Sequence, residues 1–197
     1  MDWYGEHKAD QQIYENFFND LDFKGIMVDV GAADPTEISM SKAFRERGWR
    51  TISIDPNPDW IMLHKVHQSE AYQYAISDVT GIMPFYINTR APMSYSSLGM
   101  RYNPDYNVNF SKINVEVITL DSLLKKLEID HVDFLAVDTE GWELDVMRSF
   151  DVKKYSPKVI QLESLEKQDE ERYNNYMNEI GYRLWKRVYI NNIYIKK

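Results

Sequence analysis

Short apolar runs alternate with stretches of helical periodicity along the first half of this chain, and this alternation restricts its fold more than any other feature. Residues 25–31 form an apolar run bounded by glycines, as expected of a strand buried on both faces. Two more strands are predicted at residues 51–54 and 72–76, and helical stretches precede them at residues 38–47 and 60–68. Strands that alternate with helices in this way pair in parallel, with helices on both faces of the sheet.

The pattern changes after Asp78 and then returns to the same alternation. Residues 82–118 are predicted to be an insertion, a strand hairpin that carries a polar loop at residues 88–109. The chain is expected to end in an antiparallel strand pair within residues 183–195, with its tight turn at the Asn191-Asn192 dipeptide. Between these two features we expect helices at residues 120–127, 142–150 and around 173–180, and strands at residues 132–137 and 158–162.

The predicted fold class is therefore α/β: a doubly wound, mostly parallel Rossmann-like sheet with an antiparallel C-terminal strand pair and an inserted hairpin and loop. A chain of 197 residues has the size of one domain, so we expect a single domain over residues 1–197. Its N-terminal helical segment covers residues 1–24. Little chain lies beyond the core fold. We therefore expect that any site for a substrate is formed mainly by that segment and by the insertion.

Composition excludes several classes of protein. No cysteine is present, which excludes disulfides, thiolate zinc sites and cysteine nucleophiles. The net charge of -8 argues against tight nucleic-acid binding, because no broad basic surface would displace counterions from phosphates. No apolar run approaches the ~20 residues that a membrane span requires. We therefore expect a cytoplasmic protein that binds neither membrane nor nucleic acid.

Acidic residues follow five of the predicted strands. Ligands of open α/β sheets bind outside the carboxyl ends of the strands, so these side chains are expected to line one site. Each could also be a turn or helix-capping residue, since Asp is favoured at helix N-termini. The acids in question are Asp29, Asp55, Asp78, Asp138 and Glu163.

The loop after the first strand argues against a dinucleotide cofactor. Gly31 stands alone, whereas a pyrophosphate would require three glycines in G-x-G-x-x-G spacing. Asp29 and Asp34 flank Gly31, and their charges would repel a pyrophosphate but suit a cationic ligand such as S-adenosylmethionine. Asp55, after the second strand, is placed to accept hydrogen bonds from both ribose hydroxyls. Ser77 and Asp78, after the third strand, could meet the adenine amino group.

Several motifs taken together resemble the FkbM-type methyltransferases, which are class I S-adenosylmethionine-dependent enzymes that usually O-methylate hydroxyls of sugars or natural products. The most specific motif is Asp138-Thr139-Glu140-Gly141-Trp142-Glu143, and the resemblance extends from about residue 10 to the C-terminus. Pro35 stands where family members usually have a second glycine, and proline has no amide hydrogen. The other motifs are Val28-Asp29-Val30-Gly31-Ala32-Ala33-Asp34, Ile54-Asp55-Pro56-Asn57-Pro58, Ala75-Ile76-Ser77-Asp78 and Val117-Ile118-Thr119-Leu120-Asp121-Ser122-Leu123.

The resemblance and the strand ends together assign roles to particular residues. Asp138 is the first candidate for the base that deprotonates the acceptor, Glu163 the second, and His64 or His67 the third. Glu140, Tyr95, Ser96 and Ser97 are the predicted acceptor-binding residues. The predicted cofactor-binding residues are Asp29, Gly31, Ala32, Ala33, Asp34, Asp55, Pro56, Ser77, Asp78 and Asp138.

Four alternatives stay open at this point. Asp138 and Glu163 could instead hold a divalent metal ion, since hard cations prefer carboxylate oxygens. An N-methyltransferase would have the same cofactor site, and a cofactor-binding module without catalysis would also fit, given Pro35. The antiparallel C-terminal strands could pair in a homodimer. The partner that we expect is a small-molecule or glycan hydroxyl acceptor.

Overall fold

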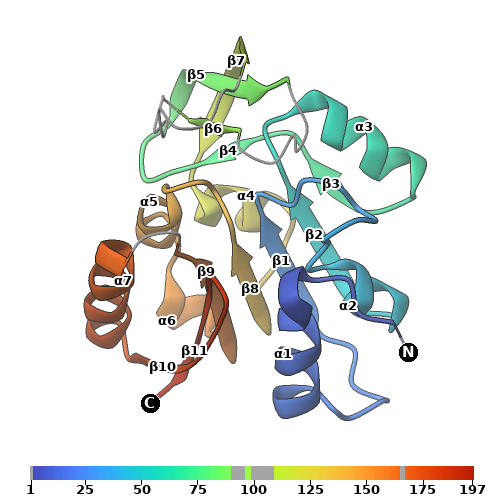
Figure 1. Ribbon diagram of the computed structural model, residues 1–197, viewed down its shortest axis with the longest axis vertical. Coiled ribbons are helices and arrows are strands. Elements are labelled where there is room, and N and C mark those ends of the chain that lie inside the picture. The colour runs from blue at the N-terminus through green and yellow to red at the C-terminus, as the bar shows by residue number, and fades with distance from the viewer. Residues whose placement is uncertain (1, 90–95, 99–108, 165–166) are drawn as a thin grey trace.

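The computed structural model describes residues 2–89, 96–98, 109–164 and 167–197. Its centre is a seven-stranded sheet whose strand order is β10-β11-β9-β8-β1-β2-β3 (Figure 1). The pairs joining β9, β8, β1, β2 and β3 are parallel, and β11 is antiparallel to both its neighbours. The predicted doubly wound, mostly parallel sheet with an antiparallel C-terminal pair is confirmed. Its strands are β1 (Ile26–Val30), β2 (Arg50–Ile54), β3 (Ala71–Tyr72), β8 (Phe134–Val137), β9 (Val159–Glu163), β10 (Tyr182–Val188) and β11 (Asn191–Lys196).

Helices cover both faces of this sheet because successive strand residues point to opposite sides. On one side, Met27 and Phe134 pack with residues of α1 (Ala9–Phe17) and α2 (Lys42–Glu46). On the other side, strand residues such as Val28 and Leu135 pack against four further helices. These are α4 (Leu120–Lys126), α5 (Glu143–Arg148), α6 (Val152–Tyr155) and α7 (Lys167–Glu179), while α3 (Pro58–Val66) connects β2 to β3, and a single 3-10 turn, η1 (Glu6–Lys8), precedes α1.

The predicted insertion and the short strand before it form a second, four-stranded sheet of order β4-β7-β5-β6, called the inserted sheet below. Its strands are β4 (Ala75–Ile76), β5 (Gly81–Asn88), β6 (Ser97–Leu98) and β7 (Phe110–Ile118), and β5 pairs antiparallel with β7 along its whole length. Figure 1 shows this sheet at the top, beyond the carboxyl ends of the parallel strands. The insertion therefore stands over the edge where the candidate site residues lie.

The sequence predictions differ from the structure in four places. The single strand expected at residues 72–76 is two strands, β3 and β4, which belong to different sheets. The hairpin turn falls at residues 189–190 rather than at the Asn191-Asn192 dipeptide, because both asparagines are buried in β11 and pair with β9. The helix expected at residues 38–47 is shorter, and helix α6 was not expected.

No helix in the described part of the chain is long and apolar enough to cross a membrane.

Candidate active site

The loop after β1 packs against the backbone that follows β8. Gly31 has a φ of +82°, and a Cβ atom added there would lie 1.6 Å from the carbonyl oxygen of Asp138. Only glycine fits this position for two reasons. Other residues rarely adopt this left-handed backbone conformation, and their Cβ atom would clash with the Asp138 carbonyl oxygen. The two loops that carry most of the candidate residues are therefore in direct contact.

Asp29, on β1, is buried with one oxygen left unpaired. Its side chain lies on the α1 and α2 side of the sheet and is 4% exposed, and its Oδ2 has no hydrogen-bond partner within the described residues. Burial raises the pKa of Asp29 to about 6, which nearby Ser41 and the positive charge of Arg45 partly offset. A buried carboxylate oxygen without a donor is costly, so this atom is suited to a cationic or N–H group of a ligand.

Asp55, at the end of β2, fixes the loop after β1 (residues 31–36), which is the predicted cofactor loop. One oxygen accepts a hydrogen bond from the Ala33 amide at 3.1 Å, and the other accepts one from the Asn57 amide at 2.8 Å. Burial raises the pKa of Asp55 to about 6, although both hydrogen bonds act in the opposite direction. Each carboxylate oxygen keeps a further lone pair, which is available to ribose hydroxyls.

His64, on α3, holds the other backbone polar group of the same residue, Ala33. Its Nε2 lies 3.0 Å from the Ala33 carbonyl oxygen, and its Nδ1 lies 2.5 Å from the Ser69 hydroxyl. Burial lowers the pKa of His64 to about 4, so the ring is neutral near pH 7. Because both ring nitrogens are occupied, His64 supports the loop rather than serving as a base or metal ligand. His67 is exposed and does not share this position.

The remaining residues of the loop mainly organise the loop itself. Asp34 accepts hydrogen bonds from the Thr36 amide and hydroxyl, both at 2.7 Å, and from the Glu37 amide at 3.0 Å. Burial alone would raise the pKa of Asp34, but these hydrogen bonds outweigh it and the pKa is lowered. The Asp34 carboxylate is therefore bound to the next residues of its own loop. Pro35 is buried, and its carbonyl oxygen accepts a hydrogen bond from Arg45. Ala32 is buried beside Gly31.

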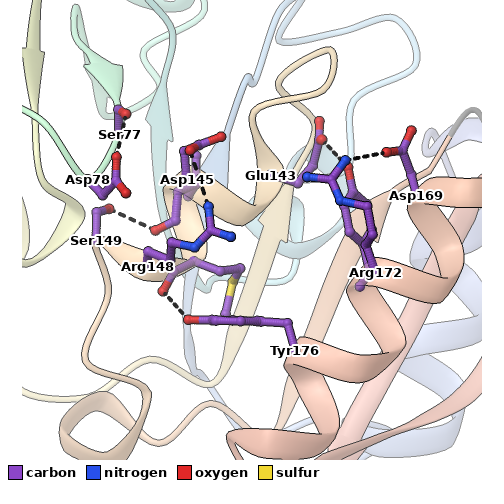
Figure 2. A network of polar contacts seen from close by, with 12 residues as sticks. Ser77, Asp78, Glu143, Asp145, Arg148, Ser149, Asp169, Arg172 and Tyr176 are labelled. Carbon is purple, nitrogen blue, oxygen red and sulfur yellow. Dashed lines mark hydrogen bonds and ion pairs between the residues drawn. The ribbon is translucent and has the colours of Figure 1, made fainter.

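The residues predicted to meet adenine lie at the end of β4. Ser77 is fully buried, and its hydroxyl lies 3.4 Å from Oδ1 of the exposed Asp78, as Figure 2 shows. Pro56, after β2, is half-buried, and its carbonyl oxygen is 3.4 Å from the amide of Gln73. The third predicted strand end thus belongs to the inserted sheet rather than to the central one.

Beyond β8 and β9 the structure brings several carboxylates together. Oxygens of Asp138, Glu143 and Glu163 lie within 4.8 Å of one another. Asp138 and Glu163 share a hydrogen bond, which two carboxyl groups can form only when one of them is protonated. Burial and repulsion from Asp138 and Glu140 raise the pKa of Glu163 strongly, so Glu163 holds the proton. The sequence therefore placed Asp138 and Glu163 correctly at neighbouring strand ends.

Asp138 and Glu140 are both perturbed by this crowding. The Asp138 side chain is exposed to solvent, yet the surrounding protein and the charge of Glu143 raise its pKa. Burial, followed by repulsion from Asp138 and Glu143, raises the pKa of Glu140 to about 9. Groups whose pKa values approach or exceed neutrality are suited to proton transfer at neutral pH.

Glu143, which was not among the predicted site residues, organises this part of the site. Its Oε1 accepts hydrogen bonds from the amides of Thr139 at 2.9 Å and Gly141 at 3.0 Å, and its Oε2 accepts one from the Tyr173 hydroxyl at 2.5 Å. The side chain is 1% exposed. Its presence in the Asp138–Glu143 motif was the one sequence signal of this role.

Glu6 reaches the site from outside the central fold. Its Oε2 accepts a hydrogen bond from the Asn191 side chain at 3.3 Å, and Asn191 is paired in register with Glu163. The charge of Glu6 contributes to the raised pKa values of Asp138 and Glu140. No local sequence pattern marks Glu6, because its position depends on how η1 packs over the ends of β9 and β11.

The insertion meets the site through Trp142. Its indole N–H donates a hydrogen bond to the Leu98 carbonyl oxygen of β6, and its ring packs on the core of the inserted sheet. Ser96 and Ser97 precede and begin β6, and the Ser96 hydroxyl accepts a hydrogen bond from the Asn88 amide at 3.0 Å. Tyr95 lies outside the described residues. The predicted acceptor-binding serines are thus tied to the helix that follows Asp138.

The same carboxylates are the oxygen donors that a divalent cation would require. Asp138, Glu143 and Glu163 are the group that could hold one. A cation would have to displace the proton shared by Asp138 and Glu163 and compete with the four hydrogen bonds that Glu143 accepts.

The residues predicted to bind the cofactor carry groups that would suit S-adenosylmethionine. The unpaired Oδ2 of Asp29 offers an acceptor to its ammonium group, and Asp55 offers acceptors to a ribose diol. Gly31 lets the backbone of the loop pass close to the β8 end, where no side chain would fit.

The mostly parallel sheet with helices on both faces defines a Rossmann-like α/β fold, and the candidate residues lie at the carboxyl ends of its strands. More specifically, the chain belongs to the FkbM methyltransferase domain family, whose model matches residues 29–184. No curated protein sequence matches the chain.

Solved structures resemble it as well. The crystal structure of methyltransferase FkbM from Methylobacillus flagellatus KT has a TM-score of 0.56 and 15% sequence identity, and the match covers 91% of this chain and 46% of that one. The chain thus spans less than half the length of that protein, and the likeness supports the fold alone. Precorrin 8w decarboxylase from Methanobacterium thermoautotrophicum has a TM-score of 0.42 and 15% identity, with 88% of this chain and 82% of that one covered.

Proposed function

We propose that this protein is an S-adenosylmethionine-dependent O-methyltransferase that acts on a hydroxyl of a sugar, a glycan or a small natural product. One observation carries the proposal: the loop that follows the unpaired buried carboxylate oxygen of Asp29 abuts the backbone of Asp138, whose own carboxyl group is paired with that of Glu163. The first feature suits a cationic cofactor, and the second suits the removal of a proton from an acceptor. The family supports methyl transfer in general.

In this proposal the chain binds the cofactor through three positions. Asp29 accepts a hydrogen bond from the ammonium group, Asp55 accepts hydrogen bonds from the ribose hydroxyls, and Ser77 with Asp78 meets the adenine. S-adenosylmethionine supplies a methyl group on a positively charged sulfur. Holding the reactants in line can supply much of the rate enhancement of a displacement reaction.

Asp138 is the proposed base. Its carboxylate takes the proton from the acceptor hydroxyl while the oxygen forms its bond to the methyl carbon. A raised pKa makes Asp138 a better base than an ordinary aspartate, and an exposed side chain can reach an acceptor. Glu163 keeps its own proton directed at Asp138 and so fixes the orientation of the base.

The proposed acceptor site lies between Asp138 and the inserted sheet. Glu140 and the β6 segment with Ser96 and Ser97 supply polar groups on that side, and the predicted contact from Tyr95 falls outside the described residues. Glu6 borders the site on the other side through Asn191.

Transfer of a labelled methyl group to a panel of glycans and small hydroxylated compounds tests this proposal. We expect transfer to a hydroxyl compound by the wild type, and a rate at least about 100-fold lower for Asp138→Asn, the lower end of what general base catalysis contributes. Asp145→Asn, on the neighbouring helix α5, is the matched control and should retain activity. Wild-type rates in Asp138→Asn would remove Asp138 as the base, and cofactor binding without transfer to any compound would favour a binding module.

A further inference from the structure

Helix α7 contacts the carboxylate cluster of Asp138, Glu143 and Glu163 through the hydroxyl group of Tyr173. The Tyr173 side chain is 2% exposed, and its hydroxyl donates a hydrogen bond of 2.5 Å to Glu143 Oε2. Burial and the nearby Glu143 charge raise the pKa of Tyr173, so the hydroxyl stays protonated and keeps donating. Glu143 thereby has a fixed partner on a different element from its own.

The other oxygen of Glu143 holds the loop that follows the proposed base. It accepts hydrogen bonds from the amides of Thr139 and Gly141 and from the Thr139 hydroxyl. In this loop, Glu140 has a φ of +54° and Gly141 a φ of +95°, so two successive residues adopt the left-handed backbone conformation. Such a conformation is unfavourable for Glu140 and persists only where surrounding contacts hold it.

We propose that Tyr173 is a positioning residue of the active site: by fixing Glu143 it holds the 139–141 loop, and so aims Asp138 and Glu140 at the acceptor. This inference rests on the proposed function, since it assigns a role within the same site. The Asp138 carbonyl abuts Gly31, so movement of this loop also displaces the cofactor loop. Tyr173 therefore influences both halves of the site without touching either reactant.

Helix α7 also supplies a matched control. Tyr176 lies three residues further along the same helix, and its hydroxyl donates a hydrogen bond of 3.3 Å to the Met147 carbonyl oxygen of α5 (Figure 2). Tyr173→Phe and Tyr176→Phe each remove one hydroxyl that bridges α7 to α5. Only the first removes a bond to Glu143.

The test is amide hydrogen exchange, measured by NMR, at Thr139 and Gly141 in the two variants. We expect Tyr173→Phe to accelerate exchange at both amides by at least about 10-fold, as the loss of one hydrogen bond to a charged group implies, and Tyr176→Phe to leave them unchanged. Calorimetry should also show about 3- to 10-fold weaker binding of S-adenosylhomocysteine for Tyr173→Phe alone. Equal exchange rates at these amides in both variants would overturn the proposal.

A second pair of variants keeps the test decisive if Tyr173→Phe does not fold. Glu143→Gln retains an oxygen for the two loop amides and an N–H for the Tyr173 oxygen, whereas Glu143→Ala retains neither. Protection of Thr139 and Gly141 in Glu143→Gln, with its loss in Glu143→Ala, supports the positioning role, and identical exchange in the two variants contradicts it. Absence of S-adenosylhomocysteine binding by the wild type would refute the proposed function, while the exchange experiment would still decide the role of Tyr173.

Discussion

At the scale of single residues, burial sets the charge state of the groups that surround the cofactor loop. Asp29 and Asp55 have pKa values raised to about 6, whereas that of His64 is lowered to about 4, and in each case burial is the largest cause. All three side chains favour the neutral form more than they would in water. Near pH 7 the two aspartates are nevertheless mostly ionised and His64 is neutral, which is the combination that suits a cationic ligand.

This arrangement predicts that cofactor binding weakens in mild acid. Only ionised Asp55 offers all its lone pairs to the ribose, and with a pKa of about 6 it is about one-tenth ionised at pH 5. We expect the dissociation constant of S-adenosylhomocysteine to rise about tenfold between pH 7 and pH 5 on account of Asp55. Calorimetry across this range should give a steeper pH dependence for the wild type than for Asp55→Asn. The same slope in both proteins would show that Asp55 does not titrate in binding.

At the scale of elements, the sequence predicted what depends on local patterns and missed what depends on packing between distant segments. Apolar runs marked the strands, and acids after them marked Asp29, Asp55, Asp138 and Glu163. By contrast, Glu6 and the Glu143 to Tyr173 bond depend on how η1 and α7 pack on the sheet. The hairpin turn was misplaced because Asn191 and Asn192 match a turn in composition but are buried in register with β9.

The contact between the β1 and β8 loops gives a prediction at this scale. Gly31→Ala would drive a methyl group into the Asp138 carbonyl and force alanine into left-handed backbone, so it should lower the free energy of unfolding by about 3 kcal/mol or more. Gly181→Ala has a similar φ of +91° with no atom within 4 Å of the added carbon, and it should lose only about 1–2 kcal/mol. Urea unfolding measures both values, and equal losses would contradict the proposed tight packing of the two loops.

At the scale of the whole molecule, the acidic surplus has a location. The net charge of -8 includes seven acids at or near the carboxyl edge of the sheet, beyond which the inserted sheet lies in Figure 1, and Glu6 of η1 reaches this edge through Asn191. The fold and the family are established on this scale. Four points stay predictions: the hydroxyl acceptor, a homodimer through the C-terminal strands, the lack of nucleic-acid or membrane binding and a cytoplasmic location. The seven are Glu6, Asp29, Asp55, Asp138, Glu140, Glu143 and Glu163.

The central claim is that this edge binds S-adenosylmethionine, and isothermal calorimetry with S-adenosylmethionine and S-adenosylhomocysteine tests it most directly. The wild type should bind both compounds. Asp55→Ala should weaken binding by about 1–3 kcal/mol through the loss of hydrogen bonds to a charged group. Asp59→Ala, an exposed acid in the first turn of α3, should bind as the wild type does. Absence of binding of either compound by the folded wild type would contradict the account.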